Sequence, residues 1–204
     1  MSVSRPNQRP SLKVRQRPVE RLFQSREAAL LWFWAFHIVL GLGATIAPRP
    51  VSTLHALLTI LIGVLIAGSR APLMRVAYVA GYIVGAELFW RMGKAQVFWE
   101  TGKYALVLVT GIALWRARAM RIPPTLLFYI LLLLPASILT LEQFSLNEAR
   151  QQISFNLSGP LALFVSGWFF SYIKFSRAEL RQFWSILLAP ILAIVAYATL
   201  DMLS

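Results

Sequence analysis

Residues Ala28–Ala47 read AALLWFWAFHIVLGLGATIA, a run without a charged side chain in which His37 is the only ionisable group. A helix needs roughly 20 mostly apolar residues to cross the hydrocarbon core of a bilayer. This run has that length and composition, and it is too long and too far into the chain for a cleaved signal peptide. The sequence therefore predicts a membrane-spanning helix here.

The composition of the whole chain agrees with a membrane protein. Of its 204 residues, 58% are hydrophobic and only 14% are charged, whereas soluble domains carry about 25% charged residues. The apolar excess argues against an intrinsically disordered chain and against a nucleic-acid-binding protein, despite a net charge of +12. With no cysteine, disulfides and Cys-based metal sites are excluded.

Six further apolar stretches follow the first one. We predict spans over residues 51–68, 76–90, 96–115, 122–141, 156–173 and 184–200, the fifth of the seven opened by the helix-starting pair Pro123–Pro124. The fold class is therefore all-α, a polytopic transmembrane helical bundle of about seven spans. Residues 1–26 form a basic tail that we expect to be largely disordered, and residues 27–204 form the transmembrane domain.

The distribution of Lys and Arg predicts the orientation of this bundle. With seven spans, all but five of the 20 basic residues fall on the side of the N-terminus. Cytoplasmic loops of membrane proteins carry an excess of Lys and Arg, so we expect the N-terminus in the cytoplasm and the C-terminus outside. The five basic residues on the outer side are Arg49, Arg91, Lys94, Lys103 and Arg150.

Charged residues gather where the third span gives way to the fourth. Glu87, Arg91, Lys94, Glu100 and Lys103 are expected in one layer in the outer part of the bilayer. In a structural interpretation, Glu87 pairs with Arg91 and Glu100 with Lys103, and the layer reaches toward the interface. In a functional one, Arg91, Lys94 and Lys103 bind an anionic group such as a lipid pyrophosphate, and Glu87 or Glu100 orients them or accepts a proton.

Two other polar features carry weaker expectations. Residues 142–156 are predicted as the longest polar loop, in which residues 146–153 could form a short interfacial helix. His37 and His55 lie within the first two spans, without the acidic or Cys partners of a metal site. We expect His37 to make a hydrogen bond between helices rather than to serve a haem or a proton relay. No cofactor, metal site or catalytic residue is assigned.

Residues 77–92, continuing into residues 98–104, and residues 153–162 resemble the membrane region of bacterial O-antigen ligase/polymerase-like proteins. The resemblance implies transfer or polymerisation of a glycan carried on a polyprenyl pyrophosphate, at the periplasmic face of the bacterial inner membrane. It makes Arg91, Lys94 and Lys103 candidates for contact with the substrate phosphate, with Glu87 and Glu100 beside them.

The chain departs from that family in one respect. Members carry a large periplasmic loop with key Arg and His residues between later helices, and this sequence has no such loop. The resemblance therefore covers the N-terminal membrane region only and implies a downstream membrane half, an oligomer or a reduced relative. The alternative function is a non-enzymatic transporter component or a membrane-anchoring interaction protein.

Overall fold

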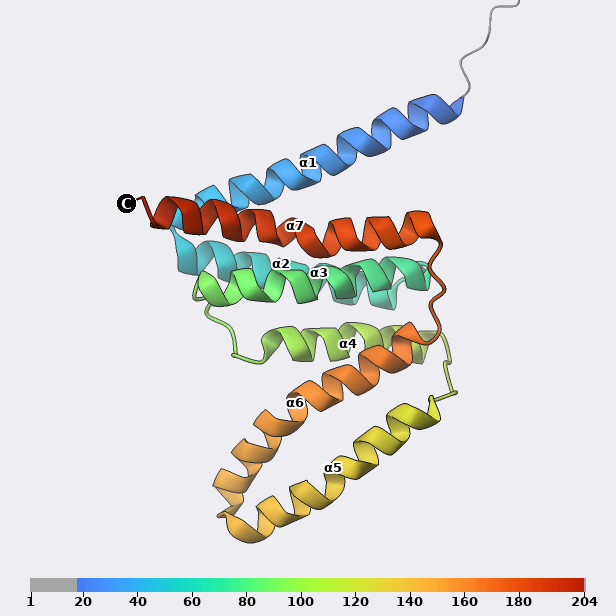
Figure 1. Cartoon of the computed structure of the whole chain (residues 1–204), viewed down its shortest axis with the longest axis vertical. Helices are drawn as coiled ribbons and strands as arrows, with labels where there is room; N and C mark the ends of the chain where they lie inside the picture. The colour runs from blue at the N-terminus through green and yellow to red at the C-terminus, as the bar shows by residue number, and fades with distance from the viewer. Residues whose placement is uncertain (1–17, 204) are drawn as a thin grey trace, which may run out of the picture.

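The computed structural model describes the backbone of residues 18–203. Side chains are described from residue 28 onward, except at residues 134, 136–137, 140–142, 146–147, 149–151, 154 and 201. The described residues form helices and no strand (Figure 1). The helices are α1 (Pro18–Ile46), α2 (Pro48–Gly68), α3 (Leu73–Met92), α4 (Thr101–Arg116), α5 (Pro124–Gln143), α6 (Leu146–Phe170) and α7 (Arg177–Asp201).

Successive helices run in alternating directions. The connections after α2, α4 and α6 lie at the end of the bundle where α1 begins, and those after α1, α3 and α5 lie at the opposite end (Figure 1). Helix α3 is central and packs against α2, α4 and α7, while α7 also packs along α1. Helices α5 and α6 form a hairpin that joins the rest of the bundle mainly through α6 and α4.

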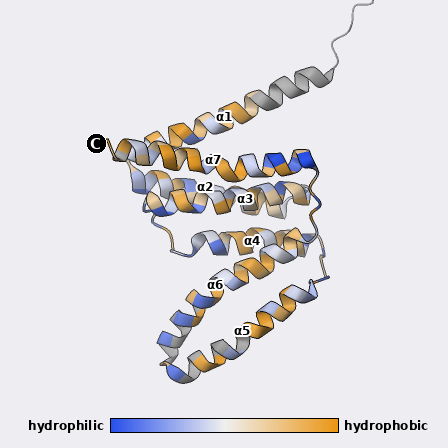
Figure 2. Ribbon diagram, viewed as in Figure 1, coloured by the Kyte–Doolittle hydropathy of each residue, from blue (hydrophilic) through white to orange (hydrophobic). Residues whose placement is uncertain are grey.

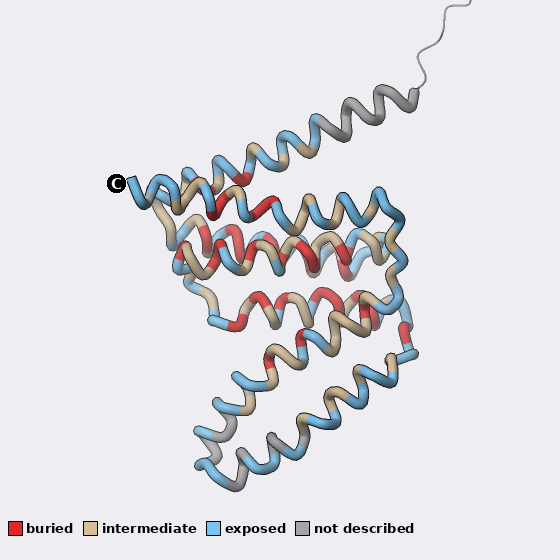
Figure 3. The backbone as a smooth tube through the Cα atoms, viewed as in Figure 1, coloured by how far each residue is buried: buried red, intermediate tan, exposed pale blue. Residues whose placement is uncertain are grey.

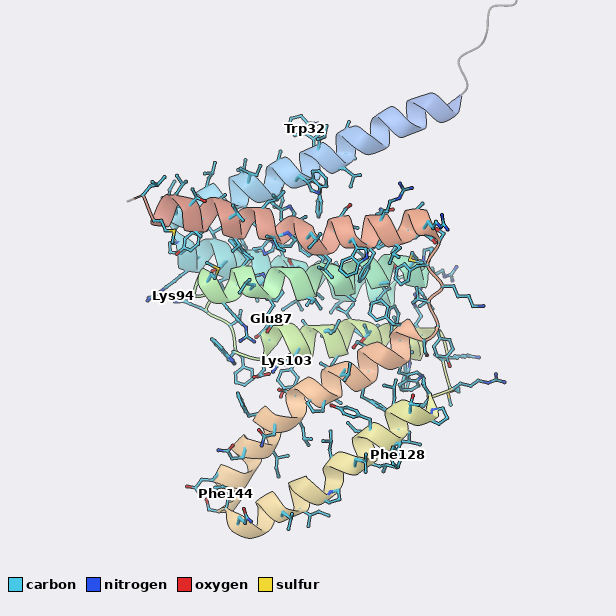
Figure 4. The ribbon with its side chains drawn as sticks, viewed as in Figure 1. Trp32, Glu87, Lys94, Lys103, Phe128 and Phe144 are labelled. Atoms are coloured by element: carbon cyan, nitrogen blue, oxygen red, sulfur yellow. The ribbon has the colours of Figure 1, made fainter. Side chains whose placement is uncertain are left out.

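The buried core consists largely of small residues, among them Ala56, Ala77, Ala80 and Ala113. Large apolar side chains point outward instead: Trp32, on the face of α1 turned away from α7, is 77% exposed (Figures 3 and 4). Hydrophobic residues occur along most of the length of the described helices (Figure 2). Small residues between helices and large apolar residues facing out are typical of helix packing in a bilayer.

Glycines let α7 approach its neighbours closely. A Cβ atom on Gly41 of α1 would meet the backbone carbonyl of Ala193, and one on Gly85 of α3 would meet that of Leu187. A Cβ atom on Gly81 of α3 would likewise meet the ring of Phe183. Gly43 has open space instead.

Four described helical stretches are long and apolar enough to cross a membrane. They are Ala28–Ile46, Pro48–Gly68, Leu73–Met92 and Arg177–Leu200. They coincide with the first, second, third and seventh predicted spans. Helix α4 has 16 residues, and the apolar parts of α5 and α6 are Pro124–Leu133 and Phe155–Phe170, which are shorter than the four.

Several predicted boundaries are wrong. The fourth helix begins at Thr101 rather than at residue 96, because residues 93–100 form a connection of turns and bends. The polar loop predicted over residues 142–156 is only a short turn, since α5 reaches Gln143 and α6 begins at Leu146 as one continuous helix. Glu148 accepts a hydrogen bond from the Ser145 hydroxyl (2.8 Å), an S-x-x-E capping arrangement that starts α6 early.

The tail prediction for residues 1–26 falls largely outside the described residues. Helix α1 begins at Pro18, and residues 1–17 belong to the part of the chain that the structure does not describe. The prediction that a helix starts at Pro123–Pro124 is confirmed, with α5 beginning at Pro124. Helix α7 begins at Arg177, seven residues before the predicted span, behind a capping box of Ser176 and Glu179.

Candidate functional site

The charged residues predicted as a site lie around the connection between α3 and α4. This connection is fastened to the first turns of α2. The Ser52 hydroxyl donates to the Gly93 carbonyl (3.0 Å), and the backbone N–H of Gln96 donates to the Thr53 hydroxyl (2.7 Å). Lys94 adopts a left-handed backbone (φ 51°) that turns the chain out of α3. The connection is therefore held in place from both sides. We call Glu87, Arg91, Lys94, Glu100 and Lys103 the α3–α4 site.

Arg91 is held in one position by two neighbours. Its guanidinium forms an ion pair with Glu87, one turn earlier on α3, including a hydrogen bond from Nε to Oε1 of 3.1 Å. The guanidinium carbon also lies 4.2 Å from the centre of the Trp99 ring, in cation–π geometry. Arg91 Nη1 has no hydrogen-bond acceptor among the described residues, so its two N–H groups remain for a ligand.

Glu87 points from α3 toward the beginning of α4 (Figure 4). Its carboxylate packs directly against Gly102 in the first turn of α4, where a Cβ atom would clash with it. A carboxylate is favourable beside the N-terminal turn of a helix, because the backbone N–H groups there carry partial positive charge. Gly102 thus allows Glu87 to sit between the two helices and to hold Arg91.

These residues line a cavity of about 260 Å³ at this end of the bundle. Glu87, Arg91 and Lys94 supply its charged groups, and Phe98 and Trp99 supply aromatic surface. Lys94 is exposed and extends outward from the end of α3 (Figure 4). The cavity therefore combines the fixed guanidinium of Arg91, the exposed ammonium of Lys94 and the carboxylate of Glu87, which is already paired with Arg91.

Glu100 and Lys103 form a second, separate cluster. Glu100 is 3% exposed; its Oε2 lies 2.6 Å from Lys103 Nζ and accepts a 2.7 Å hydrogen bond from the Ser158 hydroxyl of α6. Burial by itself would raise the pKa of Glu100, which lies in the connection outside α4. The bonds from Lys103 and Ser158 and the charges of Lys103 and Arg91 outweigh it and lower that pKa.

Both predicted ion pairs thus form, but the single charged layer divides in two. Arg91 and Lys94 share a cavity, whereas neither Lys103 nor Glu100 is among the residues that line it. The reason is that Glu100 precedes α4 and turns inward to α6, where Ser158 receives it. Ser158 was missed by sequence reasoning, because 58 residues separate it from Glu100 and no local pattern connects them.

The two histidines belong to a hydrogen-bond chain that spans three helices. Trp90 Nε1 donates to His55 Nδ1 (2.8 Å), His55 Nε2 lies 2.7 Å from the Tyr82 hydroxyl, and that hydroxyl lies 2.9 Å from His37 Nε2. The prediction that His37 bonds between helices is confirmed. Its partner Tyr82 was missed, as was the bond from Trp90 to His55. Among the described residues, no group of three or more His, Cys, Asp or Glu could hold a metal ion.

Comparison with protein-family models, curated proteins and solved structures finds no match to this chain. The class of protein follows from its own architecture. Its described residues form an all-helical bundle that includes four helices of membrane-crossing length and apolarity. It is a multi-pass helical membrane protein in a lipid bilayer environment.

Proposed function

We propose that this membrane protein binds a lipid-linked phosphate or pyrophosphate at the α3–α4 site. The position of Arg91 carries the proposal. Its guanidinium is fixed by Glu87 and by the Trp99 ring, lines a cavity of about 260 Å³, and keeps Nη1 for a ligand. A planar, immobilised guanidinium suits phosphate oxygens, and Lys94 adds a second positive charge at the rim.

We further propose that all seven helices cross the membrane with the N-terminus in the cytoplasm. The alternating helix directions support this, because they place the basic connections with Arg70, Arg118 and Lys174 at the end where α1 begins. The positive-inside rule assigns that end to the cytoplasm. The α3–α4 site is at the opposite end and would face outward.

The resemblance to O-antigen ligase/polymerase-like proteins suggests which lipid this is. In this proposal the chain is a bacterial inner-membrane protein of surface polysaccharide assembly, and its ligand is a glycan on a polyprenyl pyrophosphate at the periplasmic face. Both carboxylates of the site are engaged in ion pairs, so the geometry favours binding over general-base catalysis. The same observation favours the second candidate function, a non-enzymatic transporter component or membrane anchor.

A binding experiment tests the proposal. The full-length protein in nanodiscs is titrated with radiolabelled farnesyl pyrophosphate, comparing Arg91→Gln with Arg49→Gln. Arg49 is an exposed arginine at the same end of the bundle that does not line the cavity. Loss of a charge-assisted hydrogen bond should weaken binding by Arg91→Gln about tenfold or more, and Arg49→Gln should bind like the wild type.

Equal affinity of Arg91→Gln and wild type would overturn the assignment of the site. The proposal that the ligand is a glycan on a polyprenyl pyrophosphate is tested by measuring surface polysaccharide in cells of the source strain. There Arg91→Gln should lose surface polysaccharide while the protein still accumulates in the membrane. Intact polysaccharide in a strain whose variant no longer binds pyrophosphate would leave the transporter or anchor function as the explanation.

A further inference from the structure

A second and larger cavity, of about 580 Å³, lies between α1, α2, α3 and α7. Figure 1 shows α1 diverging from α7 on this side of the bundle. Its walls are mainly apolar and include Leu30, Phe33 and Phe36 of α1, Leu58 and Ile62 of α2, and Ile186 of α7. Cavities of this size with mostly apolar walls and a few polar groups are the usual form of small-molecule sites.

The polar residues of this wall are His55, Thr59, Tyr78, Tyr82 and Gln182, and no charged residue lines the cavity. A charged group would be costly to place there, because nothing in the wall could neutralise it. A ligand that occupies the cavity must therefore be uncharged at the part that enters, with a large apolar portion. The hydrogen-bond chain determines what a polar group of the ligand can offer to Tyr82.

Among the described residues, both imidazoles are buried away from any carboxylate, which favours their neutral form, and in that form the two ends of the chain fix the direction of every hydrogen bond in it. The Trp90 indole can only donate, so His55 Nδ1 accepts and His55 Nε2 carries the proton and donates to the Tyr82 oxygen. The Phe33 carbonyl can only accept, so His37 Nδ1 donates to it (2.7 Å) and neutral His37 uses Nε2 as an acceptor. The Tyr82 hydroxyl therefore donates to His37.

This direction leaves one acceptor position of the chain unused, on the Tyr82 oxygen. Both nitrogens of His55 are used, and the Tyr82 proton is used, but the Tyr82 oxygen retains a second lone pair. A ligand can thus bond to Tyr82 only as a donor. Thr59, one turn beyond His55 on α2, adds a second hydroxyl on the same wall.

We propose that this cavity binds an uncharged long-chain alcohol, with its hydroxyl donating to Tyr82 and its hydrocarbon chain lying against Phe33, Phe36 and Ile62. The site is distinct from the α3–α4 site and does not depend on the function proposed for it. Ordinary phospholipid acyl chains are the competing occupant, and they differ from the proposed ligand in having no donor to offer Tyr82.

The test uses matched ligands and matched variants of the full-length protein in nanodiscs. A diazirine-bearing hexadecanol is bound in competition with 1-hexadecanol, with its methyl ether, which cannot donate, or with palmitate, which is charged, and the probe that remains bound is then photocrosslinked. We expect 1-hexadecanol to displace the probe about tenfold better than the methyl ether, the effect of one buried hydrogen bond. Palmitate should compete no better than the ether.

The variants locate the site. Ala29→Trp fills the cavity without touching the hydrogen-bond chain and should abolish labelling; Ala28→Trp, on the neighbouring position that does not line the cavity, should leave it intact. Tyr82→Phe should remove the preference for the alcohol over the ether. Arg91→Gln should label normally, which separates this site from the phosphate site. Equal displacement by alcohol and ether, or full labelling of Ala29→Trp, would overturn the proposal.

Discussion

At the scale of single residues, the two carboxylates of the α3–α4 site are bonded in different ways, and Oε1 of Glu100 is buried without a hydrogen-bond partner among the described residues. Glu87 is half-buried and bonds within its own helix to Arg91, so it fixes the position of the Arg91 guanidinium. Glu100 is buried and bonds across to Ser158, so it ties the α3–α4 connection to α6. Buried carboxylates are stable only where hydrogen bonds and opposite charge replace water.

The contribution of Ser158 can be measured against a serine on the same helix. The Ser166 hydroxyl donates to a carbonyl of the preceding turn, whereas the single Ser158 proton has Glu100 Oε2 at 2.7 Å as its nearer acceptor and the Phe155 carbonyl at 2.9 Å. Ser158→Ala should lower the free energy of unfolding by about 1–3 kcal/mol, because it removes a bond to a buried charged group. Ser166→Ala should change it by less than about 0.5 kcal/mol. Denaturant titration in detergent provides the comparison, and equal values for the two variants would show that the Glu100 contact adds nothing.

At the scale of helices, the sequence predicts the presence and the order of the helices well and the residues at which they begin and end less well. The apolar runs identified the helices because the backbone N–H and C=O groups of an apolar run in a bilayer must bond within the segment, as they do in a helix. The start of α4 was misplaced because the apolar run continues through Val97, Phe98 and Trp99, which belong to the connection. The starts of α6 and α7 carried readable S-x-x-E signals at Ser145 and Ser176.

The close approach of α1 to α7 can be tested with two glycines of α1. Gly41 and Gly43 both lie in α1, but only Gly41 faces backbone atoms of α7. Gly41→Val should destabilise the protein by about 1–3 kcal/mol, as overpacking does, whereas Gly43→Val enters open space and should be nearly neutral. Thermal unfolding of the two variants decides the point. A neutral Gly41→Val would mean that α1 and α7 do not pack as closely as described.

At the scale of the whole molecule, the ion pairs of the α3–α4 site and the hydrogen-bond chain between helices differ in how far the sequence could predict them. The ion pairs of Glu87 with Arg91 and Glu100 with Lys103 follow from helical spacing and were predictable. The chain from Trp90 through His55 and Tyr82 to His37 was not, because it joins three helices across 27 to 45 residues. Such contacts depend on how helices pack rather than on any local pattern.

We propose that the two ends of the bundle face opposite sides of the membrane, the basic connections toward the cytoplasm and the α3–α4 site outward. The natural chain contains no cysteine, so a single introduced thiol reports its own position without background. The exposed residues Gln96, in the α3–α4 connection, and Ser69, between α2 and α3, mark the two ends.

The direct test is labelling of Gln96→Cys and Ser69→Cys with a membrane-impermeant maleimide in intact cells or spheroplasts. We predict that Gln96→Cys is labelled from outside, and that Ser69→Cys is labelled only after the membrane is permeabilised. Labelling of Ser69→Cys alone in intact cells, or of both residues equally, would contradict the account.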